Sequence, residues 1–147
     1  MRILPTLLIS LAVLAPQTAM ASPATEALGN CLKDNTSGKD RKELARWVFL
    51  AISAHPEIRS LSTASDATRT ESSKGMAALV TRLLADNCAA QTRAVVEKDG
   101  HQGMFNSFKA LGEVAMMELM SNQEVSASVS AYTQFVDKKR LEAVLGK

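Results

Sequence analysis

A chain of 147 residues is long enough for one domain with a core of its own. Its 17 basic and 15 acidic side chains nearly balance. This balance excludes the strongly basic classes, so we expect neither nucleic acid nor an anionic membrane surface as a partner. Ala, Leu, Met, Lys, Glu and Gln are frequent, whereas runs of β-branched and aromatic residues are scarce. That composition favours helix throughout.

The first 21 residues have the features of a secretory signal peptide. Met1-Arg2 gives a basic start, an apolar run extends from Ile3 to Ala15, and Ala19-Met20-Ala21 places small residues at positions −3 and −1. We expect cleavage after Ala21, export to a bacterial periplasm, and a helical domain over residues 22–147. A short membrane anchor is the alternative, but the apolar run falls well short of the roughly 20 residues that span a bilayer. We therefore expect no membrane insertion after cleavage.

Cys31 and Cys88 are the two cysteines of the chain. An even number of cysteines in an exported protein indicates a disulfide. A redox pair or two metal ligands are alternatives, but the CxxC spacing is absent and no histidine cluster accompanies the pair. We predict a structural disulfide, no metal site and no cofactor.

The most apolar stretch after the signal peptide is Leu44–Ala54, in which only Arg46 and Ser53 are polar. At helical spacing these two side chains fall close together, so apolar side chains surround most of the circumference. A helix of this kind is expected in the middle of other helices. Pro56 must follow its end, and we predict a buried central helix over about residues 38–54.

Caps and turn residues divide the rest of the chain. Ser37 with Asp40 approximates a capping box at the start of the central helix. Before the central helix we predict a helix over about residues 25–33, and after it a helix that runs from a cap at Thr63 or Ser65 to Asp99-Gly100. A helix with an apolar stripe from Met104 to Leu119 follows. The next predicted helix is capped by Ser121 and buries Val125, Val129, Tyr132 and Val136, and a short last helix is capped by Asp137. We therefore predict an all-α single domain, a bundle of four to five main helices around the central one.

A basic cluster at the start of the central helix is one candidate partner surface. Gly38-Lys39 suggests a P-loop, but the required glycine and hydroxyl residue are missing, because Lys33 and Asp40 stand in their places. A weaker hypothesis is that free amides of the helix start hold an anion or a partner together with the basic side chains Lys39, Arg41 and Lys42. The alternative is a solvated helix start whose acidic neighbours cancel this charge.

His55 and Glu57 form a candidate polar site just after the central helix. An imidazole beside a carboxylate could serve as a general base or a metal-ligand pair. The alternative is a histidine that interacts favourably with the helix dipole. His101, the other histidine, is expected in a loop after Gly100, so the spacing of a metal-binding histidine motif is absent.

The stripe from Met104 to Leu119 carries two further features. Ala110, Val114 and Met117 make a thin second apolar stripe, which would contact either another helix of the bundle or a partner. Gly112 lies inside the main stripe, where we expect close approach of a neighbour. Methionines gather on this helix, which is more typical of core packing than of a Cu(I) site.

Three short stretches carry a resemblance to a known group of proteins. They are residues 35–42 (NTSGKDRK), 44–47 (LARW) and 54–57 (AHPE). In these the chain resembles small secreted proteobacterial proteins of uncharacterised function. The resemblance implies export and a helical domain, and it brings no activity, cofactor or catalytic residue with it.

The functional expectation follows from a compact exported fold without a catalytic motif. We expect a non-enzymatic interaction protein of the inhibitor, immunity, adaptor or chaperone type, with a protein partner and an oligomeric state that the sequence leaves open. An alternative is a carrier of an apolar small molecule, held between the methionine-rich helix and the central helix. An enzyme that uses His55 and Glu57 is the least favoured hypothesis.

Overall fold

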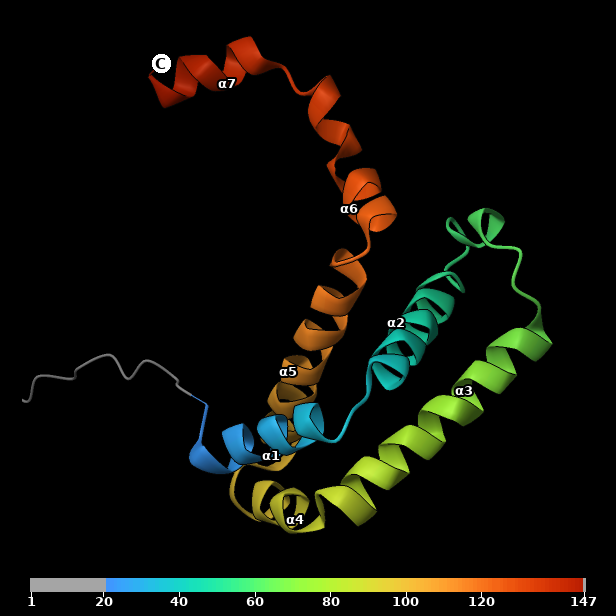
Figure 1. Ribbon diagram of the computed structural model, residues 1–147, viewed down its shortest axis with the longest axis vertical. Helices are drawn as coiled ribbons and strands as arrows, with labels where there is room; N and C mark the ends of the chain where they lie inside the picture. The colour runs from blue at the N-terminus through green and yellow to red at the C-terminus, as the bar shows by residue number, and fades with distance from the viewer. Residues whose placement is uncertain (1–20, 147) are drawn as a thin grey trace, which may run out of the picture.

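The computed structural model describes residues 21–146, so the predicted signal peptide, apart from Ala21, lies outside the described residues. The described chain is helical without a strand, which confirms the all-α single-domain prediction (Figure 1). Its elements are α1 (Pro23–Asp34), α2 (Gly38–Ile52), the 3-10 turn η1 (Arg59–Leu61), α3 (Asp66–Thr81), the π-helical turn η2 (Arg82–Asn87), α4 (Ala89–Lys98), α5 (Gly100–Met120), α6 (Gln123–Ser130), the 3-10 turn η3 (Ala131–Phe135) and α7 (Lys138–Leu145). None of the described helices combines the length and the apolar character needed to cross a bilayer.

The core lies where α1 packs against α4 and α5, and α2 packs against α3 and α5. Its fully buried leucine and valine side chains come from four different elements: Leu28 and Leu32 of α1, Leu83 of η2, Val95 of α4 and Leu111 of α5. Buried Ser107 of α5 donates a hydrogen bond to the Thr25 carbonyl of α1 at 3.0 Å. A Cβ on Gly29 of α1 would lie 3.3 Å from the Cβ of Ala110, so α1 and α5 approach each other closely.

The predicted disulfide is confirmed: Cys31 of α1 bonds to Cys88, with 5.9 Å between their Cα atoms. Cys88 is fully buried and lies between η2 and α4. The bond therefore joins the first helix directly to the centre of the core.

The long helix predicted between residues 66 and 98 is interrupted. It changes to the π-helical turn η2 after Thr81, and Cys88 breaks it before α4 takes a new direction (Figure 1). The amide of Cys88 donates to the Leu83 carbonyl at 2.8 Å, five residues back. The helix is thus interrupted at the residue that carries the disulfide to α1.

The predicted burial of α2 around its circumference is wrong. The helix buries Leu44 and Leu50, and Ser53 is buried just beyond its end. Val48 is 39%, Phe49 57% and Ile52 55% exposed. Among the described helices, α3 and α5 cover α2, and its remaining apolar face is open to solvent.

The end of the chain forms a C-terminal arm, residues 123–145, that runs away from the other helices (Figure 1). None of these residues is buried. The predicted buried face is therefore wrong, since Val129 is 53% and Tyr132 66% exposed. Asn122, and not the predicted Ser121, caps α6, whereas Asp137 caps α7 as predicted.

Candidate functional site

An apolar groove of about 520 Å³ lies between α2 and α5, and we call it the α2–α5 groove. Met76 of α3 contributes to its lining. The lining side chains of α2 and α5, with Gly112, are Leu44, Ala45, Trp47, Val48, Phe108, Gly112, Ala115, Met116 and Leu119. Trp47, Met76 and Phe108 are half-buried and pack against the core, so they attach the groove firmly to the rest of the fold.

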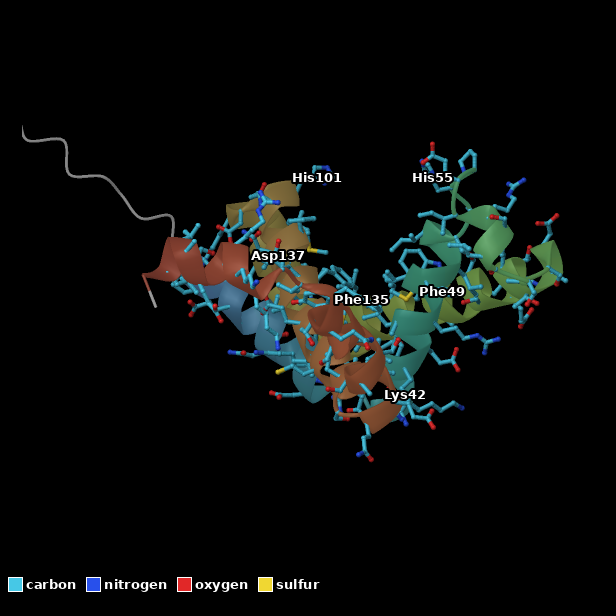
Figure 2. The ribbon with its side chains drawn as sticks, turned by 90° about the horizontal axis from the view of Figure 1, so that it is seen from above. Lys42, Phe49, His55, His101, Phe135 and Asp137 are labelled. Carbon is cyan, nitrogen blue, oxygen red and sulfur yellow. A yellow bond between two sulfur atoms is a disulfide. The ribbon has the colours of Figure 1, made fainter. Side chains whose placement is uncertain are left out.

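The groove is closed at one end by contacts between the start of α2 and the end of α5. Arg41 Nε lies 3.5 Å from Glu118 Oε2, and a Cβ on Gly38 would lie 3.3 Å from Glu118 Oε1. Away from this contact the two helices diverge. His55, just after α2, and His101, in the first turn of α5, lie on opposite sides of an open space (Figure 2).

The two walls are helix faces with regular apolar spacing. On α2, Val48 lines the groove, Ile52 lies one turn further along the same helix face, and exposed Phe49 follows Val48 directly in sequence. On α5, Phe105 is 66% and Met116 57% exposed, and both lie on the same helix face as Phe108 and Gly112. Exposed apolar side chains concentrated on two facing helices are typical of an interaction site.

Gly112 leaves room in the groove. Nothing lies within 4 Å of a Cβ built on it, so the close approach that we expected at this glycine is wrong. The close approaches occur instead at Gly29 and at Gly103, where a Cβ would lie 2.4 Å from the Cβ of Asp99. The absence of a side chain at Gly112 therefore leaves space inside the groove, and no neighbouring helix of the chain fills it.

We expected an apolar pocket between the central helix and the methionine-rich helix, and the groove lies between these two helices. The apolar stripe of α5 and the nearly all-apolar stretch Leu44–Ala54 were the signals for it. What the sequence did not indicate is that the groove stays open to solvent along exposed Phe49 and Phe105.

The basic cluster at the start of α2 is divided between solvent and structural contacts. Lys39 and Lys42 are exposed. Arg41 instead donates to the Thr36 carbonyl at 2.9 Å and pairs with Glu118, so its guanidinium is already engaged within the chain. Only the two lysines are free in the described structure to meet a partner.

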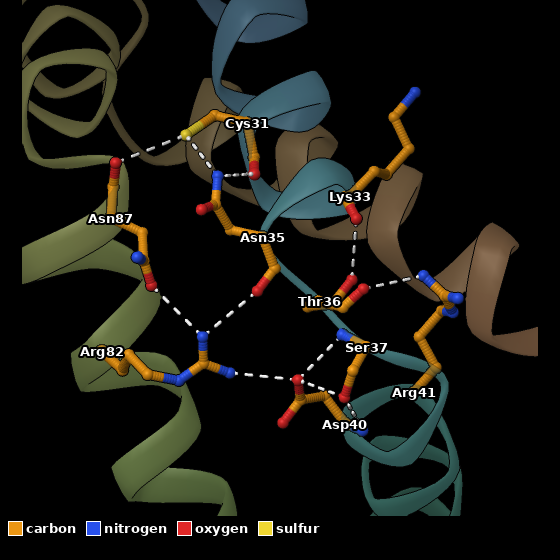
Figure 3. Close-up of polar contacts among 9 residues, drawn as sticks. All are labelled: Cys31, Lys33, Asn35, Thr36, Ser37, Asp40, Arg41, Arg82 and Asn87. Carbon is orange, nitrogen blue, oxygen red and sulfur yellow. Dashed lines mark hydrogen bonds and ion pairs between the residues drawn. The ribbon is translucent and has the colours of Figure 1, made fainter.

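Asp40 and Arg82 join the start of α2 to η2 (Figure 3). Their side chains approach to 3.1 Å, and Ser37 with Asp40 completes the predicted capping box. Partial burial raises the pKa of Asp40, but hydrogen bonds from Ser37 and the charge of Arg82 outweigh this effect and hold the pKa below 3.8. Arg82 also donates to the Asn35 carbonyl at 3.1 Å and to the side-chain oxygen of Asn87 at 3.2 Å. This network fixes the segment between α1 and α2, which leads directly into the start of α2 at the closed end of the groove.

The thin second apolar stripe of α5 (Ala110, Val114 and Met117) is partly covered by another helix of the bundle and partly open to a partner. Ala110 faces α1 beside Gly29, so this part contacts another helix of the bundle. Val114 is half-buried, and Met117 is 63% exposed. Met117 alone is left as a surface that a partner could contact.

His55 and Glu57 do not form an acid–base pair in the structure. Both side chains are exposed, and the ring Nδ1 of His55 accepts a hydrogen bond from the backbone amide of Glu57 at 3.3 Å. Neither residue lines the α2–α5 groove. Within residues 21–146, no group of three or more His, Cys, Asp or Glu side chains is arranged to hold a metal ion. His101, expected in a loop, belongs to α5.

A polar cluster that the sequence did not predict attaches the start of α1 to the end of α4. Ser22 and Thr25 both donate hydrogen bonds to Asp99 Oδ2, the latter at 2.8 Å. The bond from Ser22, and then that from Thr25, holds the pKa of Asp99 below its ordinary value of 3.8. Ser22 and Thr25 lie 77 and 74 positions before Asp99, so spacing along the sequence gave no signal for the cluster.

Comparisons with models of known protein families, with curated proteins and with solved structures found no match.

Proposed function

We propose that this protein is an exported, non-enzymatic interaction protein whose α2–α5 groove takes an amphipathic helix. The observation that carries this proposal is the pair of exposed apolar faces on α2 and α5, which diverge from the Arg41–Glu118 contact. The disulfide supports export, because such bonds persist in oxidising compartments.

A helix suits the groove in shape and chemistry. Amphipathic helices bind in apolar grooves through side chains at positions i, i+3, i+4 and i+7. The walls here are themselves helix faces, and a third helix laid between them would pack by ridges and grooves as in a bundle. The missing side chain at Gly112 permits close approach of such a helix.

A carrier of an apolar small molecule is the second candidate. The groove volume of about 520 Å³ falls within the roughly 300–1,000 Å³ of ligand sites. Small ligands are, however, usually enclosed by their sites, whereas Phe49 and Phe105 beside this groove are more than half exposed. Native mass spectrometry of freshly purified protein distinguishes the two functions, since a carrier retains a co-purified small mass.

The test is capture of a partner by the tagged mature protein from periplasmic extract, with a groove-filling variant. Gly112→Phe inserts a ring into the groove, where a Cβ meets nothing within 4 Å. Gly75→Phe is the matched control, because a Cβ at this exposed helical glycine also meets nothing within 4 Å and Gly75 is not part of the groove lining.

We expect Gly112→Phe to lose a partner that the natural protein and Gly75→Phe both capture. Circular dichroism before each capture establishes that both variants are folded. Equal capture by the two variants would show that the groove is not the binding site.

A further inference from the structure

We infer that the helix in the α2–α5 groove is the C-terminal arm of a second copy of this chain, so that two copies exchange arms. This inference rests on the proposed function, since it uses the same groove and names the helix that fills it. Three observations on the arm carry it: an apolar face without cover, short helices, and the direction in which the arm leaves α5.

The arm presents an apolar face that its own chain leaves uncovered. Val125 and Val129 lie one turn apart on α6, Tyr132 lies in the 3-10 turn η3 that follows directly, and Val136 ends that turn in an extended conformation. Tyr132 is 66% and neighbouring Phe135 82% exposed. Side chains of this size are normally covered in a folded monomer when they lie together on one face.

The arm also needs a surface to stay helical. α6 and α7 contain 8 residues each, and none of their residues is buried. Isolated helices shorter than about 12–15 residues are marginal in water, and protein helices gain most of their stability from packing. An arm with these helices is therefore ordered when it lies against an apolar surface.

The arm extends away from the α2–α5 groove of its own chain (Figure 1). Only Ser121 and Asn122 separate α5 from α6. The Ser121 hydroxyl donates to the Glu118 carbonyl at 2.6 Å, and the Asn122 side chain accepts the amides of Glu124 and Val125 at 3.0 and 3.1 Å. These bonds start α6 at the closed end of the groove, and the arm then extends away from the other helices (Figure 1). Its apolar face is thus offered to another molecule.

The chemistry and the area fit a second copy. Exposed Val48 and Met116 line the groove, and three further exposed side chains of the same two helices are Phe49, Ile52 and Phe105. The arm contributes Val129, Tyr132 and Phe135. The aromatic side chains among them each bury roughly 150–250 Å² when they are fully covered. Reciprocal exchange about a two-fold axis fills two grooves at once, which brings the buried area into the range of roughly 1,200–2,000 Å² found for stable interfaces.

The test compares the oligomeric state of the full mature chain with that of three variants by sedimentation equilibrium. Tyr132→Asp spoils the arm at an exposed position, Gly112→Phe fills the groove, and Gly75→Phe is the control. We expect the natural chain and the control to dimerise, and each of the other two variants to dimerise at least about tenfold more weakly.

Mixing the two weakened variants tests the exchange itself. The Gly112→Phe copy keeps an intact arm, and the Tyr132→Asp copy keeps an intact groove, so one of the two contacts can form between them. We expect the mixture to contain more dimer than either variant alone. A mixture without such recovery would contradict exchange between arm and groove.

The remaining outcomes separate this inference from the proposed function. A natural chain that stays monomeric at its highest soluble concentration overturns the exchange, including the case in which the arm folds back into its own groove. If that monomer still loses a captured partner on Gly112→Phe, the proposed function stands alone. A dimer that neither variant weakens would overturn the exchange as well.

Discussion

Arg41 and Glu118 approach to 3.5 Å and hold the start of α2 against the end of α5. The same guanidinium donates to the carbonyl of buried Thr36 at 2.9 Å. One side chain thus joins the segment before α2, the helix itself and α5. Because this contact closes the α2–α5 groove, its strength determines how firmly the two walls are held together.

The two partners of this contact are expected to differ in their contribution to stability. Glu118→Gln removes a partly exposed ion pair and should lower the free energy of unfolding by less than about 1 kcal/mol, with a smaller effect at high salt. Arg41→Met should cost about 1–2 kcal/mol, because it also leaves the Thr36 carbonyl without its donor. Urea unfolding of both variants measures the difference. Equal losses would mean that the bond to Thr36 contributes nothing.

The glycines of α5 are expected to respond in opposite ways to the same substitution. Gly103→Ala places a Cβ 2.4 Å from Asp99 and 2.8 Å from Val95, so overpacking should destabilise the fold by about 1–3 kcal/mol. Gly112→Ala meets nothing within 4 Å and should stabilise the helix by about 0.5–1 kcal/mol. Thermal unfolding of the pair measures this. A stabilising Gly103→Ala would show that α1 and α4 can yield at this position.

Local chemistry made much of the fold predictable. The capping box of Ser37 and Asp40, the cap at Ser65 and the left-handed Gly100, with φ +57°, all lie where the sequence placed them. Each depends on residues within a few positions of one another. The disulfide was predictable for a different reason, since the chain has two cysteines and these allow one intramolecular pairing.

The location of the groove was predictable, but its exposure was not. An apolar stretch such as Leu44–Ala54 indicates which side chains need cover, not whether the same molecule supplies it. The predicted burial of Val129 and Tyr132 failed for the same reason, because the arm leaves the bundle. The break in the helix at Cys88 coincides with the bond to Cys31, a contact between distant parts of the chain that spacing along the sequence does not reveal.

Removing the disulfide should lower stability without abolishing the fold. The bond joins residues 57 positions apart, and the Cys31→Ala/Cys88→Ala variant is expected to lose about 2–5 kcal/mol. Part of this loss comes from the unfolded chain, which gains freedom, and part from the space left at fully buried Cys88. Chemical unfolding with and without reductant measures it for the natural chain. Equal masses after alkylation of the denatured protein, with and without reduction, would contradict the bond.

Asp99 should make the protein sensitive to acid. Hydrogen bonds from Ser22 and Thr25 hold the pKa of this carboxyl below 3.8 in the folded state. A depressed pKa contributes stability that is fully present above the unfolded value of about 3.9 and is lost as the pH falls through the lower folded value. The melting temperature should therefore fall more steeply below about pH 4 in the natural chain than in Asp99→Asn.

Ser22→Ala provides the matched variant for this pH dependence, because it keeps the carboxyl and removes the first of its hydrogen bonds. Ser22 also accepts the Thr25 amide at the start of α1, so this variant should be less stable by about 1 kcal/mol at every pH. Its acid slope, however, should lie between those of the natural chain and Asp99→Asn. Thermal melts from pH 7 downward measure both effects. An unchanged acid slope in Asp99→Asn would show that this carboxyl does not control the acid response, and would leave Asp40, whose pKa is also lowered, as the group to test next.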